Sequence, residues 1–291
     1  MNNKIFIAGG SGLIGKHLAQ KLKELNYNVV ILSRNATGNS IAYPKNSSEL
    51  SKIIDGADVV INLAGANIVG KRWNREYKKE LYDSRIETTK YLVSAINLTN
   101  NKPYFISTSA VGYYGDRGNK VVNEDTNPDN GFIASICTDW EDEAKKANTE
   151  TFITRIGIVL AKEGGALKEM LLPYKLFVGG PLSTGKQWFP WIHITDLINI
   201  YIFAIENKLT GTANVVSPHQ IQMNDFAKTL GQVLRRPAFF RVPAFAIKLI
   251  LGEASQEVLR SQRVAPKSLI DNNFNFKFNT LSLALKDLLE K

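Results

Sequence analysis

A cluster of glycines near the start of the chain has the spacing of a phosphate-binding turn. The segment Gly9-Gly10-Ser11-Gly12-Leu13-Ile14-Gly15 contains G-x-G-x-x-G from Gly10 and G-x-x-G-x-x-G from Gly9. Glycines permit a tight turn and a close approach of the backbone to a phosphate, and a helix N-terminus offers unpaired N–H groups and the positive end of its dipole. All seven residues are therefore predicted to bind a pyrophosphate, and a purely structural turn is the alternative.

The elements on either side of this cluster decide between those two interpretations. Residues 5–8 are a short apolar run bounded by glycines, which is typical of a buried strand. Apolar residues recur at helical spacing from Leu13 to Leu25, and residues 29–32 form a second apolar run. The glycines thus join a strand to a helix, which is where a dinucleotide binds in such a unit.

The residues after the second predicted strand indicate which dinucleotide binds. An acidic residue there would hydrogen-bond a ribose 2′-hydroxyl and select NAD. No Asp or Glu occurs from Val29 through Ser40, whereas Ser33-Arg34 supplies a hydroxyl and a guanidinium. Arginine neutralises and forks onto a phosphate, so NADP is the predicted cofactor. The alternative is a solvent-facing arginine at the end of a strand.

The alternation of strands and helices predicts the fold class. Further strands are expected at residues 41–43, 58–63, 104–107 and 152–160, and helices at 48–54, 73–97 and 132–147. Strands alternating with crossover helices indicate an α/β fold, a doubly wound parallel Rossmann sheet. Residues 63–65, Leu63-Ala64-Gly65, would then reach the carboxyl end of their strand, against the adenosine half of the cofactor.

The second half of the chain follows a looser pattern. Glycines and prolines interrupt residues 164–190, a helix is expected at 195–206 and a strand at 214–216, and mostly helices follow. We expect a Rossmann domain over 1–216, with 164–192 contributing to the substrate cleft, and a smaller, mostly helical C-terminal cap over 217–291.

Composition narrows the class of protein. The 291 residues include 44% hydrophobic and 22% charged residues, close to globular averages. The net charge of +9 favours the binding of anions, but the basic residues are scattered, so no nucleic-acid partner is expected.

Residues 244–252 are too short to span a membrane. With a single cysteine, Cys137, a disulfide framework is impossible, and a cytoplasmic protein without a membrane partner is predicted.

The sequence resembles the extended and atypical short-chain dehydrogenase/reductase superfamily, and within it the NAD(P)-dependent epimerase-like proteins with a distinctive C-terminal domain. The likeness spans nearly the whole chain. Its specific signatures are Arg72-Trp73, Gly112-Tyr113-Tyr114-Gly115, Gly179-Gly180-Pro181 and the segments 187–196 and 262–267. The resemblance implies an NADP site lined by Gly9, Gly12, Gly15, Ser33, Arg34, Leu63, Ala64, Glu80 and Arg85. Glu80 and Arg85 would otherwise pair with charges on a solvated helix face.

One element of the superfamily's chemistry is missing. Hydride-transferring members usually carry Tyr-x-x-x-Lys, in which the lysine lowers the tyrosine pKa. None of the ten tyrosines is followed four residues later by lysine, and Ile133 and Cys137 occupy the corresponding helix positions. The remaining candidates are Ser109, to orient a carbonyl or hydroxyl, and Tyr114, as acid/base. Packing of the loop is the alternative for Tyr114.

Several other residues receive weaker interpretations. Arg155, Lys175 and Lys186 are candidates to bind an anionic substrate. The aromatic segment 188–191 is either a pocket wall or core. Cys137 is expected to be a buried structural residue, His193 is explained by helix entry, and no metal site is predicted from three histidines without ligand spacing.

The predicted function is that of an NADP-binding oxidoreductase or epimerase-like enzyme acting by hydride transfer on an unknown small carbonyl or hydroxyl compound. The alternative is a non-catalytic NADP-dependent sensor or interaction module, because Tyr-x-x-x-Lys is absent. A homodimer is possible through the helices at 73–97 and 132–147.

Overall fold

The computed structural model describes residues 3–34, 36 and 40–290. Among them, seven strands form one sheet in the order β10-β7-β5-β4-β1-β2-β3, and every neighbouring pair is parallel. Their bounds are β1 Lys4–Ala8, β2 Asn28–Ser33, β3 Ser40–Ala42, β4 Val59–Asn62, β5 Tyr104–Ala110, β7 Thr151–Ile156 and β10 Gly211–Val215. The chain reverses direction of travel across the sheet between β1 and β4, which creates a crevice at their carboxyl ends. The predicted doubly wound Rossmann sheet is confirmed.

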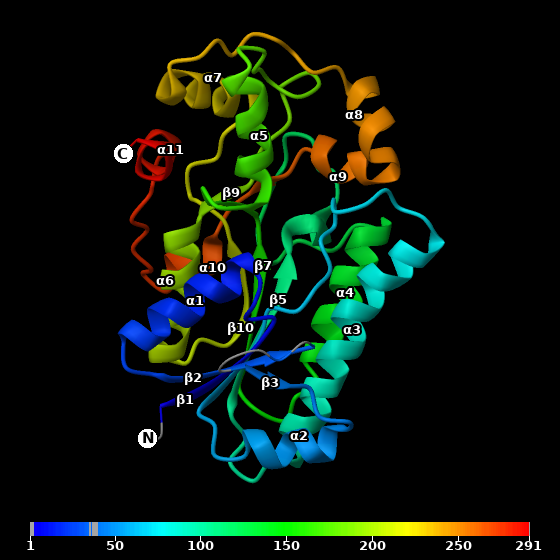
Figure 1. Ribbon diagram of the computed structural model, residues 1–291, viewed down its shortest axis with the longest axis vertical. Helices are drawn as coiled ribbons and strands as arrows, with labels where there is room; N and C mark the ends of the chain where they lie inside the picture. The colour runs from blue at the N-terminus through cyan, green and yellow to red at the C-terminus, as the bar shows by residue number, and fades with distance from the viewer. Residues whose placement is uncertain (1–2, 35, 37–39, 291) are drawn as a thin grey trace.

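Helices cover both faces of this sheet (Figure 1). One layer contains α1 Leu13–Glu24 and α6 Ile194–Asn207, which pack together; the other contains α2 Ser47–Ile54, α3 Arg75–Leu98 and α4 Phe132–Ala144. Strand β1 shows how the sheet serves both layers. Ile5 and Ile7 belong to one hydrophobic cluster, and Phe6 and Ala8 belong to the other, because successive side chains point to opposite faces.

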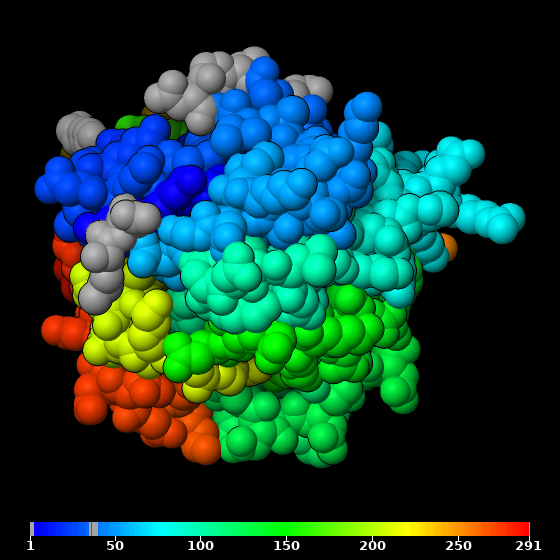
Figure 2. Space-filling view, turned by 90° about the horizontal axis from the view of Figure 1, so that it is seen from below, coloured from blue at the N-terminus to red at the C-terminus, as the bar shows by residue number. Residues whose placement is uncertain are grey.

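The order of the strands in the sheet is also the order in which the segments of the chain follow one another across the lower face of the molecule. Figure 2 looks onto the amino ends of the strands, where the colours run from blue at one edge, through green, to orange at the other. Helix α2, at the lower end of the molecule in Figure 1, forms part of this face. The crevice between β1 and β4 lies at the opposite, carboxyl ends of the strands.

The strand predicted over 152–160 is broken, which corrects the sequence-based expectation. Strand β7 ends at Ile156, and β8 Ile158–Leu160 leaves the main sheet to pair with β9 Trp191–His193. Gly157 makes the break possible, because a Cβ there would lie 2.3 Å from the carbonyl oxygen of Pro190 and 2.7 Å from a methyl carbon of Val216. An uninterrupted apolar run does not reveal such a bend.

Residues 111–234 contribute further elements around the carboxyl ends of the strands. They are the 3-10 helix η1 Val111–Tyr114, strand β6 Val121–Val122, α5 Gly165–Lys175 and α7 Met223–Leu234. Helix α5 was not predicted, because Pro173 and the flanking glycines are typical of a loop. The proline lies inside the helix, within its last turn.

The C-terminal cap is mostly helical, as predicted, and it wraps around the Rossmann domain (Figure 1). Besides α7, its elements are α8 Ala244–Leu251, η2 Gly252–Ala254, α9 Ser255–Leu259, β11 Arg263–Val264, α10 Lys267–Asp271 and α11 Leu281–Leu289. Strand β11 pairs with β6, α10 packs on β10, and α11 packs on α7. The carboxylate of Asp196 accepts the backbone N–H groups of Lys277 and Phe278, both at 2.9 Å. The predicted boundary at residue 216 stays a prediction.

The described residues contain no helix that is long and apolar enough to cross a membrane.

Candidate functional site

A groove of about 1000 Å³ opens at the carboxyl ends of β1, β2 and β4, where the chain reverses across the sheet. Its floor comes from the glycine loop and the end of β4, and one wall comes from α3. The predicted residues that line it are Gly9, Ser11, Gly12, Ser33, Arg34, Leu63, Ala64, Gly65 and Glu80. Crevices of this kind are where open α/β sheets bind their ligands.

The glycine loop has two kinds of glycine. Gly9 has a φ of +78°, and a Cβ there would lie 2.7 Å from the backbone of Leu63; a Cβ at Gly15 would lie 2.5 Å from Gly9 and Gly10. These glycines are required by packing within the protein. Gly12 differs, because among the described residues a Cβ there would meet only the Gly9 carbonyl, at 3.4 Å.

Gly12 is also the N-cap of α1. Among the described residues no side chain caps this helix, and its first turn holds no acidic residue. The free helix terminus and the open space above Gly12 together form a suitable seat for an anion.

The end of β2 supplies the residues that would distinguish the cofactors. Ser33 and Arg34 line the groove beside Tyr43. Burial raises the pKa of Tyr43 to about 12, although the Arg34 charge opposes that shift. The Tyr43 phenol therefore stays neutral, and the Arg34 guanidinium supplies the charge at this wall of the groove.

Two side chains, Asn62 and Arg85, hold the loop after β4 in place through hydrogen bonds. Asn62 donates from Nδ2 to the Thr89 hydroxyl at 2.8 Å and accepts the Ala64 N–H at 3.1 Å. Arg85 donates to the Ala66 carbonyl at 2.8 Å and to the Leu81 carbonyl at 2.9 Å. Arg85 is buried, which lowers its pKa. It therefore supports the groove from behind.

Several groove residues lay outside the sequence-based prediction, and several predicted residues are not among those that line the groove. The second group is Gly10, Leu13, Ile14, Gly15 and Arg85. The lining residues that were missed are Leu32, Tyr43, Ala66, Glu76, Lys79, Asp83, Ser84 and Thr88. Glu76, Lys79 and Asp83 share one face of the predicted helix with Glu80, and that spacing was the available signal.

A buried polar network lies at the end of β5, where Ser109 was predicted to act. Ser109 donates from Oγ to Oε1 of Glu141 at 2.7 Å. The same carboxylate accepts two hydrogen bonds from Arg155, each at 2.8 Å. Ser109, Glu141 and Arg155 are 1%, 1% and 4% exposed. Burial alone would lower the pKa of Arg155, but its hydrogen bonds to Glu141 and that residue's charge raise it overall.

Tyr114 belongs to the same network. It is fully buried, its hydroxyl donates to Oδ1 of Asn214 at 2.7 Å, and it accepts a hydrogen bond from Nη1 of Arg155 at 2.8 Å. Burial raises its pKa to about 12, against the influence of Arg155. The neighbouring Tyr113 packs its ring against the Arg155 guanidinium, 3.5 Å from Cζ to the ring centroid. The proton and one lone pair of the Tyr114 hydroxyl are thus engaged within the protein.

The helix positions that correspond to Tyr-x-x-x-Lys are apolar and buried. Ile133 and Cys137 pack in one cluster beside Gly112, where a Cβ would lie 2.6 Å from Cγ2 of Ile133. Burial raises the pKa of the Cys137 thiol to about 12, so the expectation of a structural cysteine is confirmed. His193 is the N-cap of α6, as expected, and its Nδ1 accepts the Thr195 N–H at 3.0 Å.

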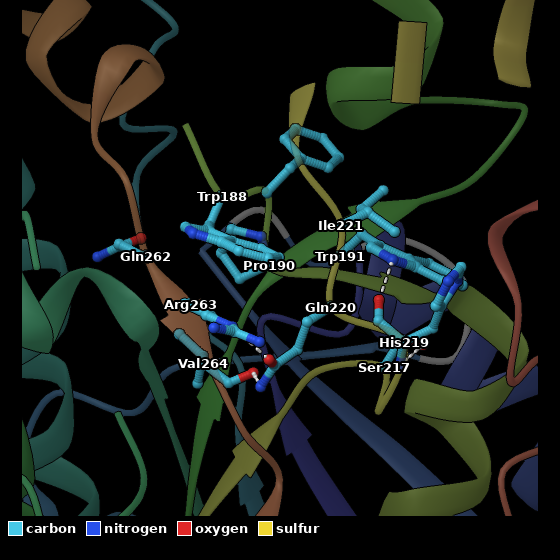
Figure 3. Close-up of a pocket in the computed structure, with 11 residues that line it drawn as sticks. Trp188, Pro190, Trp191, Ser217, His219, Gln220, Ile221, Gln262, Arg263 and Val264 are labelled. Atoms are coloured by element: carbon cyan, nitrogen blue, oxygen red, sulfur yellow. Dashed lines mark hydrogen bonds between the residues drawn. The ribbon is translucent and has the colours of Figure 1, made fainter. Parts of the chain in front are cut away.

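The aromatic segment 188–191 forms a packed junction between the Rossmann domain and the C-terminal cap (Figure 3). Trp191 is buried and donates from Nε1 to the His219 carbonyl at 3.0 Å. Arg263 stacks on Trp188 at 4.3 Å and donates to Oε1 of Gln220 at 2.8 Å. The void between these residues is about 10 Å³, at most the room of one water. Phe189, Pro190 and Trp191 are buried and Trp188 is partly exposed, and a contribution of this segment to a substrate pocket stays a prediction.

Comparison with known families agrees with this geometry. The model of the NAD dependent epimerase/dehydratase family matches residues 5–217, which is most of the chain. The chain belongs to this family. A second model, a domain of unknown function designated DUF1731, matches residues 242–288 in the C-terminal cap. The predicted superfamily and its distinctive C-terminal domain are therefore confirmed.

Relatives in the epimerase family cover the whole chain. The mouse epimerase family protein SDR39U1 is 37% identical, with 98% of this chain and 99% of the relative aligned. A chloroplastic homologue from Arabidopsis thaliana is 35% identical, over 98% of this chain and 86% of the relative. A crystal structure of human SDR39U1 (isoform 2) with NADPH has a TM-score of 0.93 and 34% identity, and it covers 99% of both chains.

Proposed function

We propose that the protein binds NADP(H) in the groove and transfers hydride to or from a carbon that carries oxygen in a small carbonyl or hydroxyl compound. The observation that carries this proposal is the combination of an open, uncapped helix N-terminus at Gly12 with Arg34 at the end of β2. The NADPH in the human relative's crystal structure supports the cofactor prediction. The proposal covers both net reduction and epimerisation.

The groove residues fit this cofactor at its two charged ends. The pyrophosphate would lie over Gly12, against the N–H groups of the first turn of α1. The 2′-phosphate would lie beside Arg34, with the Ser33 hydroxyl nearby. Once bound, the nicotinamide supplies or accepts hydride, and the chain's own residues position the reacting partner.

Ser109 is the residue at the end of β5 that we assign to the substrate. Its hydrogen is donated to Glu141 and its side chain is 1% exposed, so an Oγ lone pair would accept a hydrogen bond from a substrate hydroxyl once substrate binding opens the end of β5. Glu141 and Arg155 hold that orientation. Tyr114 is better assigned as a positioning residue for Arg155 than as the acid/base, because its hydroxyl is committed to Asn214 and Arg155.

A fluorescence titration with NADPH and with NADH tests the cofactor assignment. Wild-type protein is expected to prefer NADPH, and Arg34→Ala is expected to lose at least about tenfold in NADPH affinity with little change for NADH. Lys52→Ala, which removes an exposed charge from α2, is the matched control. Equal affinities of wild-type and Arg34→Ala for NADPH would contradict the proposal.

The absence of Tyr-x-x-x-Lys and the internally satisfied Tyr114 favour a second candidate, a non-catalytic NADP-dependent sensor or interaction module. NADPH oxidation measured across aldehydes, ketones and quinones separates the two. The enzyme is expected to turn over at least one compound, with a loss of about tenfold or more in Ser109→Ala and intact NADPH affinity. Binding of NADPH without turnover of any compound would favour the sensor.

A further inference from the structure

Large apolar side chains are exposed at the end of the molecule formed by α5, α8 and the connection between α7 and α8. Phe239, Phe245 and Leu249 are each 73% exposed, and Leu172 and Leu176 on α5 exceed 60%. Soluble surfaces seldom gather so many exposed apolar side chains in one place, and such groups mark interaction sites. We call the following residues the apolar tip: Leu172, Leu176, Phe177, Phe239, Phe245 and Leu249.

Backbone and ring contacts join the two segments that carry the apolar tip. The N–H of Phe240 donates to the Gly179 carbonyl at 3.1 Å, and the Val242 N–H donates to the Pro181 carbonyl at 3.0 Å. Arg236 stacks on the Phe177 ring at 4.3 Å. In Figure 1 the connection between α7 and α8 passes over the upper end of α5, at the opposite end of the long axis from the N-terminus. The residues therefore share one end of the fold.

Charge distinguishes this end from the rest of the chain. No Asp or Glu occurs in residues 170–195 or in residues 226–252, although the whole chain contains 27. The same two segments contain these basic residues: Lys175, Lys186, Lys228, Arg235, Arg236, Arg241 and Lys248. Apolar side chains surrounded by positive charge match the interface of a bilayer with anionic headgroups.

We propose that the apolar tip docks on the surface of an anionic lipid bilayer, with its aromatic and leucine side chains at the headgroup boundary and its lysines and arginines on the lipid phosphates. Helix α8 contributes eight residues, which is enough to lie in the interface and too few to span it. The sequence-based expectation of no membrane partner rested on the absence of a spanning segment, and docking at the interface requires none. The proposal does not depend on cofactor binding.

Co-sedimentation with vesicles tests this proposal. Wild-type protein is expected to sediment with vesicles that contain about one third phosphatidylglycerol and to stay in solution with phosphatidylcholine vesicles, at about 0.15 M salt. Binding should weaken at about 0.5 M salt, because the lipid charge is screened. The double variant Phe239→Ser/Leu249→Ser is expected to lose at least about tenfold in partitioning.

Matched variants separate the apolar and electrostatic contributions. Leu98→Ser removes a side chain that is 58% exposed at the end of α3 and should change nothing. Lys175→Glu/Lys248→Glu should weaken binding, whereas Lys52→Glu/Lys90→Glu, with the same charge change on α2 and α3, should have a smaller effect. Unchanged NADPH affinity and melting temperature in each variant establish that the fold is intact.

Three results would overturn the proposal. The wild-type protein could stay in solution with the anionic vesicles, or the Phe239→Ser/Leu249→Ser variant could bind as tightly as wild type. As the third result, sedimentation velocity could show concentration-dependent dimers of the wild type that the same double variant abolishes, while the protein does not bind the vesicles. That outcome would assign the apolar tip to contact with a second copy of the chain.

Discussion

At the scale of single residues, the most informative feature is the buried ion pair between Glu141 and Arg155. Burying an ion pair costs desolvation free energy unless the hydrogen bonds of both groups are satisfied. Here the carboxylate accepts from Ser109 and twice from Arg155, and the guanidinium also reaches the Tyr114 hydroxyl. Glu141 lies on α4 four residues after Cys137, and Arg155 lies on β7. The pair gives Ser109 a fixed orientation without supplying an evident proton donor.

Glu141→Gln is expected to lower the free energy of unfolding by about 3–5 kcal/mol, because Arg155 would remain as an uncompensated buried charge. Urea denaturation measures the change. Asp139→Asn, an exposed carboxylate two residues away on α4, is the control and should stay within about 0.5 kcal/mol. A Glu141→Gln protein as stable as the control would show that the pair is not held as described.

At the scale of elements, the start of α6 ties the Rossmann domain to the C-terminal segment. His193 caps the helix, and its ring stacks on Phe278, with centroids 3.7 Å apart. Its Nε2 lies 3.4 Å from the Asp287 carboxylate on α11. Burial lowers the pKa of His193 to about 4, although Asp287 opposes the shift and Lys277 adds to it. The native structure therefore holds this imidazole neutral.

The consequence is a dependence of stability on pH. Between pH about 6.5 and about 4 the unfolded chain binds a proton at His193 that the folded chain does not, so the free energy of unfolding should fall as the pH is lowered through this range. The contribution is about 3 kcal/mol. His193→Asn keeps an N-cap acceptor and should make the profile shallower, whereas His17→Asn on the surface of α1 should leave it steep. Chemical denaturation at several pH values measures both, and identical profiles for wild type and His193→Asn would refute this assignment.

At the scale of the whole molecule, the two ends of the fold have different surfaces. The outward faces of α3 and α4 carry exposed charged residues such as Glu87, Lys90, Asp139 and Asp142. Such faces offer little apolar area for the helix pairing that the predicted homodimer would use, and the dimer stays a prediction. Exposed apolar area is instead concentrated at the apolar tip, beyond the carboxyl ends of the strands. Any stable association of the molecule is therefore expected at that end.

The local sequence was sufficient for the Rossmann half. The glycine loop, the apolar runs of β1, β2 and β4 and the position of Arg34 are properties of neighbouring residues, and each was predicted. Periodicity and the requirements of a tight phosphate-binding turn are local, because strand burial, helix spacing and positive φ angles are set within a few residues.

Only the tertiary structure decided the rest. The pairing of Glu141 with Ser109 and Arg155 joins a helix to two strands, and the break at Gly157 depends on Pro190 and Val216. The placement of Arg85 behind the groove and the packing of Trp191 likewise depend on partners distant in sequence. Residue types and spacing predict which side chains are suited to chemistry or to the core. Which of them meet is decided by long-range packing, because a side chain's hydrogen bonds and burial depend on segments that the chain brings together only when it folds.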